Sequence, residues 1–243
     1  MNYKQLEVYN ILLTPIIADK KAGKIRKQNG IITSPQKYYS SADEDMCDFA
    51  IGFYETLYYD NLLKSTYMLN DKKLRNKCYA GDTMNSFNTI ANLMKGISWD
   101  SGNITMNPYL LYYKVHYHCL ANFWVIPMEH GRRSAKRVAC TKNYDSPILY
   151  TQVLNEKFDK ISNDVMLKEY FSNLPINIFE SIHYLPETGD SQQIRQLYEN
   201  GEGEKLLHLA LSFIEKRAKK IVSDDEMTDK LYDYFDSIKL IDY

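Results

Sequence analysis

The sequence predicts a mainly α-helical protein, a single multi-helix domain that spans residues 1–243. Apolar residues recur at spacings of three and four along much of the chain, which is the period of an amphipathic helix. Helix caps and helix stops bracket several of these stretches. Ten glycines and seven prolines leave few residues for the many tight turns of a β-sandwich or barrel. We expect at most a short strand or hairpin, around residues 122–140.

Composition and charge exclude several classes of protein. A hydrophobic fraction of 44% supplies enough material for a core, which argues against a disordered chain. The net charge of −1 creates no overall field that attracts nucleic acid or a membrane, so any anion site requires a local patch. Four widely spaced cysteines fit neither a disulfide scaffold nor a structural zinc site. Without a signal peptide or a run of about 18 apolar residues, we expect a cytoplasmic protein with no membrane partner.

The first 60 residues are expected to contain one long helix. A short segment at residues 6–13 precedes a basic loop at residues 19–30, which ends in the turn signal Asn29-Gly30. A helix over residues 43–59 follows, because acidic residues suit its N-terminus and apolar residues recur every four positions, at Phe49, Phe53 and Leu57. The carboxylates of Asp45 and Asp48 are compatible with a metal site, but capping and solvation explain them more simply.

The next helix is expected between Gly81-Asp82 and Gly96, with Asp82 as its N-cap. One face carries apolar residues, namely Met84, Phe87, Ala91 and Met94. Another face carries three amides, namely Asn85, Asn88 and Asn92. Asparagine is an unfavourable helix residue, so three on one face require a reason. The simpler reason is a polar face towards solvent or another helix, and the functional one is a row of amides that faces a ligand.

Residues 107–127 permit two interpretations. Pro108 suits the first turn of a helix, so we expect a helix over residues 109–121 and then a short buried strand at residues 123–126, which ends at Pro127. The alternative is one long strand from Leu110 onward, because tyrosine, valine and leucine dominate this stretch. We favour the helix.

The C-terminal half is expected to be helical throughout, over residues 145–161, 163–173, 175–184, 189–199, 203–222 and 224–238. The helix over residues 203–222 has a regular apolar stripe, formed by Leu207, Ala210, Leu211, Ile214, Ala218 and Ile221. Its C-terminal end is basic, with Lys216, Arg217, Lys219 and Lys220. Cations at that end complement the helix dipole, so they do not require a nucleic-acid role. The final helix is acidic on its outer side and is expected to pack against this basic end.

The residues best suited to chemistry lie between 116 and 145. Three of the five histidines, His116, His118 and His130, precede a basic run that contains Arg132, Arg133 and Lys136. Imidazoles bind metals and transfer protons, and guanidinium groups match phosphates. No acidic residue neutralises the chain from residue 130 to residue 143. A solvated surface loop is the commonest explanation of such a run, but the adjacent histidines favour a site for a phosphate ester or a polyanion.

The two histidines at 116 and 118 would share one face of a strand, but they would diverge on a helix. Because we favour a helix here, a two-histidine metal site is disfavoured, and no His-Glu-x-x-His or Cys-x-x-Cys pattern is present. His118 alone is either a core histidine that bonds to a backbone carbonyl, or a general base or metal ligand. Asn122 suits a turn, where its side chain would bond to the backbone and position His118 without touching a substrate. The cofactor stays unassigned, with a divalent metal ion as one candidate.

Two short segments carry a resemblance to a known family. They read Gly81-Asp82-Thr83-Met84-Asn85-Ser86-Phe87 and His118-Cys119-Leu120-Ala121-Asn122-Phe123, the second followed by Pro127. They resemble an uncharacterised bacterial family with a Gly-Asp-Thr-Met-Asn-Ser-Phe stretch and a later His-x-x-Gly-Asn-Phe stretch. The chain has Ala121 where the family tends to have glycine. The matched residues cover under a tenth of the chain, and the resemblance implies no assigned activity.

The second of these segments also resembles the distal half of HNH-type nuclease domains of modification-dependent restriction enzymes. That resemblance aligns Asn122, His130 and Lys142 with the distal elements and Arg217 with a late arginine. The proximal element, which supplies the general base, is missing upstream of residue 110. The resemblance therefore implies a nuclease site only if His116 or His118 provides the base.

Two hypotheses of function follow. The first is a bacterial or phage protein that binds a phosphate-bearing ligand, foremost nucleic acid, with nuclease-like cleavage of a phosphodiester. His118 would be the base or a metal ligand, Asn122 would orient it, and Asp82 and Asn85 would complete the site. His116 and His130 are further catalytic candidates, and the phosphate contacts would be Arg132, Arg133 and Lys136. The second hypothesis is a non-catalytic helical component of a defence or counter-defence system, which binds a protein partner through a tyrosine-rich surface.

Overall fold

The computed structural model describes residues 1–36, 44–58, 78–82, 90–91, 93–94, 108–127, 181–186, 196–197 and 199–241. Of these residues 62% are helical, which confirms a mainly α-helical fold. The described helices are α1 (Tyr3–Leu12), α2 (Asp48–Tyr58), α5 (Pro108–His116), α11 (Gly203–Val222) and α12 (Asp225–Ser237), with short 3-10 turns η1 (Glu44–Met46) and η3 (Leu120–Asn122). The strands are β1 (Ile16–Ala18), β2 (Arg26–Gln28), β3 (Ile31–Ser34), β4 (Cys78–Asp82) and β5 (Phe123–Pro127).

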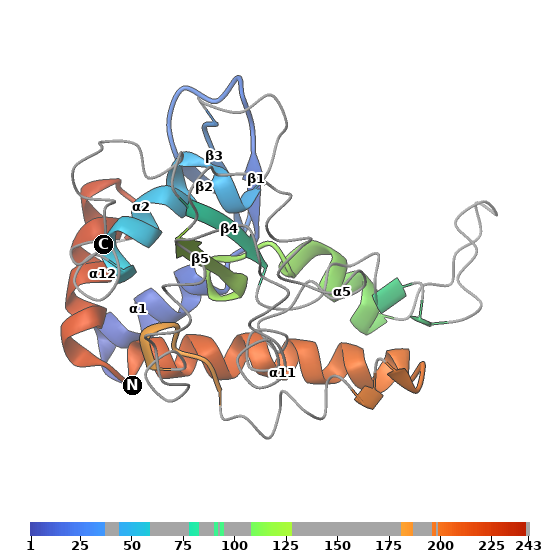
Figure 1. Cartoon of the computed structure of the whole chain (residues 1–243). Coiled ribbons are helices and arrows are strands. Elements are labelled where there is room, and N and C mark those ends of the chain that lie inside the picture. Colours follow the sequence, from blue (N-terminus) through green and yellow to red (C-terminus); the bar gives the residue numbers. More distant parts are fainter. Residues whose placement is uncertain are drawn as a thin grey trace.

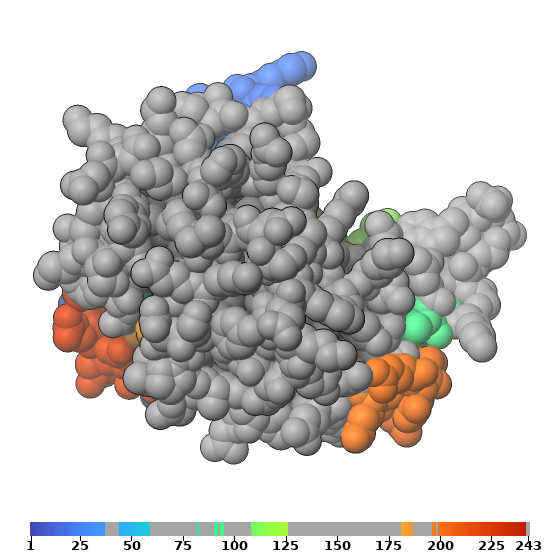
Figure 2. All heavy atoms as spheres, viewed as in Figure 1, coloured from blue at the N-terminus to red at the C-terminus, as the bar shows by residue number. Residues whose placement is uncertain are grey.

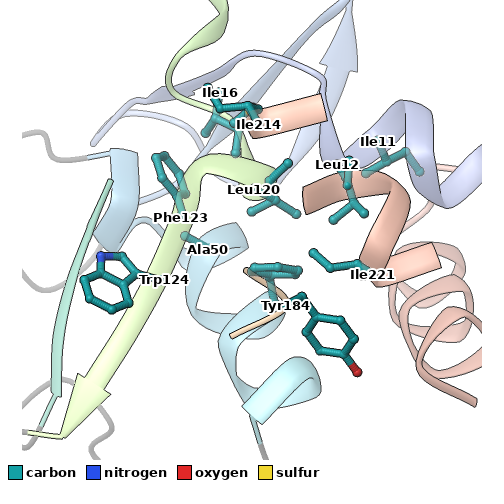
Figure 3. Close-up of a cluster of buried hydrophobic side chains, with 14 of the residues drawn as sticks. Ile11, Leu12, Ile16, Ala50, Leu120, Phe123, Trp124, Tyr184, Ile214 and Ile221 are labelled. Carbon is teal, nitrogen blue, oxygen red and sulfur yellow. The ribbon is translucent and has the colours of Figure 1, made fainter. Parts of the chain in front are cut away.

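The long helix α11 runs along one side of the molecule, and α1 and α5 both pack against it (Figure 1). Helix α12 contacts α1, α2 and α11. Where η3 and β5 meet α1 and α11, apolar side chains such as Leu12, Leu120 and Ile214 point into one cluster (Figure 3). In the space-filling view, parts of the N-terminal region and of α11 and α12 reach opposite edges of the molecule (Figure 2). The apolar stripe of α11 forms part of the buried core shown in Figure 3.

The two C-terminal helices confirm the sequence prediction closely. Helix α11 occupies residues 203–222 as expected, and a Cβ at Gly203 would lie 2.8 Å from backbone atoms of residues 93 and 94. Only glycine permits that approach of two helical segments. Helix α12 starts at the N-cap Asp224, whose carboxylate accepts a hydrogen bond of 3.0 Å from the backbone N–H of Met227.

The prediction of a basic loop at residues 19–30 is wrong in part. Strand β3 lies between β1 and β2, parallel to β1 and antiparallel to β2, and forms a three-stranded sheet. The turn signal was correct, since Asn29 (φ 52°) and Gly30 (φ 73°) both adopt the positive φ of a type I′ hairpin turn. The sequence pattern did not indicate strand β2, because all three of its residues are exposed and show no alternation of apolar and polar side chains. The expectation that strands occur only around residues 122–140 is therefore wrong.

A second pairing joins β4 to β5 in an antiparallel ladder, with Gly81 opposite Trp124 and Asp82 opposite Phe123. The expected buried strand that ends at Pro127 is confirmed. Gly81 and Asp82 are the last two residues of strand β4, and the first turns of the helix expected after the cap Asp82 fall on residues 83–89, which lie outside the described residues. Helical residues are described further on, at 90, 91 and 93, whereas Asn85 and Asn88 lie outside the described residues.

The remaining predictions concern α2 and α5. The helix expected over residues 43–59 starts with the turn η1 and continues as α2, whose residues Phe49, Phe53 and Leu57 are buried as expected. The helix expected after Pro108 is present as α5, and it ends at His116 rather than at residue 121.

Within the described residues, no helix is both long enough and apolar enough to cross a membrane. The helices expected over residues 145–173 lie outside the described ranges.

Candidate functional site

Four of the predicted site residues fall in the described part of the chain, namely Asp82, His116, His118 and Asn122. The others lie outside it, namely Asn85, His130, Arg132, Arg133 and Lys136. The described residues therefore include the part of the candidate site around His116 and His118, but not the predicted phosphate-binding residues.

His118 forms a pair with a carboxylate that lies 74 positions earlier in the chain. Its Nδ1 is 3.2 Å from Oε2 of Glu44, and the two side chains are 28% and 21% exposed. A carboxylate oxygen only accepts, so with a neutral imidazole the pair places the hydrogen on Nδ1 and leaves Nε2 with a lone pair. The ring of Tyr117 lies 3.8 Å from that of His118 between centroids. The pair is thus held by neighbours and still open to solvent.

Further carboxylates lie close to this pair. The pKa of Tyr117 is raised, first by burial and then by the negative charges of Asp82, Glu44 and Asp45. These three acids therefore act on one ring that packs against His118. The described residues contain no group of three His, Cys, Asp or Glu side chains arranged to hold a metal ion.

Asn122 is fully buried, and its Nδ2 donates a hydrogen bond of 2.7 Å to the backbone carbonyl of Tyr117. The side chain thus spans the turn that carries His118 and fixes it from within. This is the positioning arrangement that the sequence suggests for an asparagine in a turn.

His116 lies in a different environment from His118. Its ring stacks on Tyr112, with centroids 3.8 Å apart and an interplanar angle of 13°. Its Nδ1 lies 2.8 Å from the backbone carbonyl of Tyr112, which accepts a hydrogen bond from it. The two histidines have separate neighbours, and only His116 lies on the helix, because α5 ends there.

The sequence interpretation missed a buried polar network behind this turn. Arg217 of α11 is fully buried, although it was predicted among the basic residues at the helix end. Its Nη1 donates to the carbonyls of Ala121 and Phe123 at 2.7 Å each, and its Nε donates to the carbonyl of His183 at 2.9 Å. Its Nη2 donates to the hydroxyl of Tyr58 at 3.2 Å. The guanidinium therefore joins three segments that are distant in the sequence.

His183 is also fully buried in this network. Its Nδ1 lies 3.2 Å from the Tyr58 hydroxyl, and its ring meets the edge of Trp124 with centroids 5.3 Å apart. Burial, with a contribution from the adjacent Arg217 cation, lowers the pKa of His183 well below its ordinary value. The imidazole is therefore neutral at pH 7.

One signal in the sequence could have revealed Arg217. It stands three residues after Ile214 and four before Ile221, within the apolar stripe of the helix. A cation at a core position of an amphipathic helix indicates a buried polar network. No comparable signal identifies Glu44, because acidic side chains are common at the start of a helix.

Comparison of the chain with protein-family models, with curated proteins and with solved structures finds no match. The function is therefore argued from the arrangement of the chain's own residues.

Proposed function

We propose that the protein binds a phosphate-bearing ligand, foremost nucleic acid, and cleaves a phosphodiester with His118 as general base. The observation that carries this proposal is the carboxylate of Glu44, 3.2 Å from Nδ1 of a partly exposed imidazole. A carboxylate in this position fixes the tautomer and orientation of a histidine that acts through its other nitrogen.

The proposed reaction uses a water molecule as nucleophile. Nε2 of His118 takes a proton from the water, and the water oxygen forms a bond to phosphorus. The bond from phosphorus to the leaving ester oxygen breaks on the opposite side of the phosphorus, so that oxygen takes its proton from a solvent water, and the imidazolium returns the proton that it accepted to solvent. Glu44 and the other acids near Tyr117 stabilise the imidazolium between these steps. General base catalysis of this kind accelerates a reaction by about 10²- to 10⁴-fold.

The other predicted residues have supporting roles in this proposal. Asn122 fixes the turn that carries His118, and Asp82 belongs to the carboxylates around Tyr117. Arg132, Arg133 and Lys136 would bind the phosphates, because guanidinium and ammonium groups match phosphate oxygens. His116, His130 and Asn85 remain candidates for direct contacts with the ligand. A divalent metal ion is retained as a candidate cofactor and is tested together with the substrate.

The decisive experiment is a cleavage assay with plasmid DNA, single-stranded DNA and RNA, each with Mg²⁺, Mn²⁺ or Zn²⁺. We expect cleavage by the wild-type protein, a loss of about 100-fold or more in His118→Ala and a smaller loss in Glu44→Gln. The matched control is His208→Ala, since His208 is an exposed histidine on α11 whose ring meets that of Tyr109 edge-on. Full activity in a folded His118→Ala variant would refute the assignment of the base.

Phosphate binding has its own test. If Arg132 and Arg133 bind phosphates, affinity for nucleic acid falls steeply as salt concentration rises, because bound counterions are released. The double variant Arg132→Ala with Arg133→Ala then binds more weakly and shows a shallower salt dependence by about two counterions. Binding that does not respond to salt removes this part of the proposal.

A specific observation favours the alternative, a non-catalytic component of a defence or counter-defence system that binds a protein partner. Helix α5 exposes large apolar side chains, each between 45% and 54% exposed, namely Tyr109, Leu111, Tyr112 and Val115. Exposed apolar and aromatic side chains on one element are typical of protein interfaces. A photo-crosslinking residue at position 111 would capture one defined protein in cells, and the same residue at position 216 would not.

A further inference from the structure

Almost every backbone carbonyl in the turn that carries His118 accepts a hydrogen bond. Donors for residues 117 to 120 come from nearby backbone and side-chain groups: Asn122 Nδ2 to Tyr117, Ile16 N–H to His118, Asn122 N–H to Cys119 and Phe123 N–H to Leu120. The next carbonyl, that of Ala121, and the one at Phe123 both accept from Nη1 of Arg217. The guanidinium therefore completes the fixation of this backbone.

The cationic side chain at this position requires an explanation. Within the described part of the chain, all four acceptors of Arg217 are neutral oxygens, and a buried cation that bonds only to such oxygens costs more in desolvation than an apolar side chain of similar volume. Burial lowers the pKa of Arg217, but a guanidinium starts so high that it stays protonated. An apolar residue would continue the stripe of α11, so the cation supplies something that packing alone does not.

The same guanidinium also fixes the helix that follows Glu44. Its Nη2 donates to Tyr58, the last residue of α2. The 3-10 turn η1, which precedes α2, is in turn tied to α2. The hydroxyl of Tyr54 on α2 donates a hydrogen bond of 2.9 Å to the carbonyl of Asp45 in this turn. Arg217 therefore bonds both to the turn that carries His118 and to the last residue of the helix α2, which follows the turn η1 that carries Glu44.

We infer that Arg217 is a positioning residue of the proposed site. Through its hydrogen bonds to the backbone of residues 121–123 and to Tyr58, it keeps His118 and Glu44 in place relative to each other. The inference rests on the proposed function for its catalytic meaning. Arg217 touches no ligand, because its side chain is fully buried behind the turn. Its planar fork is suited to this task, since several N–H groups reach acceptors on different segments at once.

The conservative variant Arg217→Lys separates positioning from charge. A lysine keeps the cation, but its single ammonium cannot reach all the acceptors that lie around the edge of the planar guanidinium. Lys216→Met is the matched control, because Lys216 is the exposed neighbour on the same helix. The readouts are cooperative unfolding in urea, the Hε1–Cε1 NMR resonance of His118, and kcat and KM on the nucleic acid that the wild-type protein cleaves fastest. His118→Ala assigns the resonance.

We expect Arg217→Lys to unfold cooperatively, to shift the His118 resonance, and to lower kcat about 10- to 100-fold with KM within about twofold of wild type. Lys216→Met should match wild type in all three. An unchanged His118 resonance in Arg217→Lys overturns the inference, whatever happens to kcat. If Arg217→Lys does not fold, Tyr58→Phe removes one acceptor of the guanidinium and is judged by the same resonance. If the wild-type protein cleaves nothing, the proposed function fails, while the resonance still decides whether Arg217 positions His118.

Discussion

The buried imidazole of His183 predicts a specific loss of stability in mild acid. Burial and the Arg217 cation lower the pKa of His183 in the folded protein, whereas the unfolded chain has the ordinary value of about 6.5. Below pH 6.5 the unfolded chain therefore binds a proton that the folded protein does not. The stabilisation is complete above that pH and is lost as the pH falls.

The size of the effect follows from the linkage relation. One proton difference changes the free energy of unfolding by about 1.4 kcal/mol per pH unit. Between pH 8 and pH 5 the loss through His183 amounts to about 2 kcal/mol, if the folded protein stays unprotonated there. Most carboxylates titrate below this window, so the range from pH 6.5 to 5 isolates the histidines.

Urea unfolding of the wild-type protein and of His183→Asn, from pH 8 to pH 5, measures this difference. Asparagine is the suitable replacement, because its amide occupies the place of Nδ1, the atom that lies 3.2 Å from the Tyr58 hydroxyl. We expect the variant to be less stable at pH 8 and to lose less stability on acidification than the wild type. Equal slopes in the two proteins would refute the assignment of His183 as a neutral buried group.

Three further predictions concern packing and burial. Arg217→Met leaves the acceptors of the guanidinium without a donor, so unfolding in urea should show a loss of about 3 kcal/mol or more, and a loss below about 1 kcal/mol would contradict the network. Gly203→Ala places a Cβ 2.8 Å from backbone atoms and should lose about 1–3 kcal/mol, whereas Gly23→Ala meets nothing within 4 Å and should change little. Burial raises the pKa of Cys47 to about 11 and that of Cys119 to about 12, so both thiols should resist alkylation at pH 8 until urea unfolds the chain, as read by peptide mass spectrometry.

Elements with a local pattern could be predicted, and elements that depend on pairing could not. The stripe of α11 and the carboxylate N-cap of α12 lie within the segments that they define. Strands β2 and β4 have no such pattern, since β2 is exposed throughout and β4 contains the sequence Cys-Tyr-Ala-Gly-Asp. Each exists because a partner strand supplies its hydrogen bonds, and for β4 that partner begins more than 40 residues later.

The candidate site shows the same division. His118 and Asn122 could be singled out, because they stand close together in one segment with a turn between them. Glu44 was interpreted as one of several acids at a helix start, since the pair with His118 joins residues that no local spacing connects. Arg217 was interpreted, with the lysines beside it, as one of the cations that complement the dipole of the helix, although its own position belongs to the buried face.

This organisation explains why no motif with a fixed spacing marks the site. The pair consists of one residue before α2 and one residue after α5, and its support comes from β1 and α11. Each contributing segment supplies a single side chain or backbone group, so each is ordinary by itself. The chemistry proposed for His118 then depends on the fold as a whole, and a substitution as distant in the sequence as Arg217→Lys should affect it more than the substitution of an adjacent exposed residue such as Lys114 on α5.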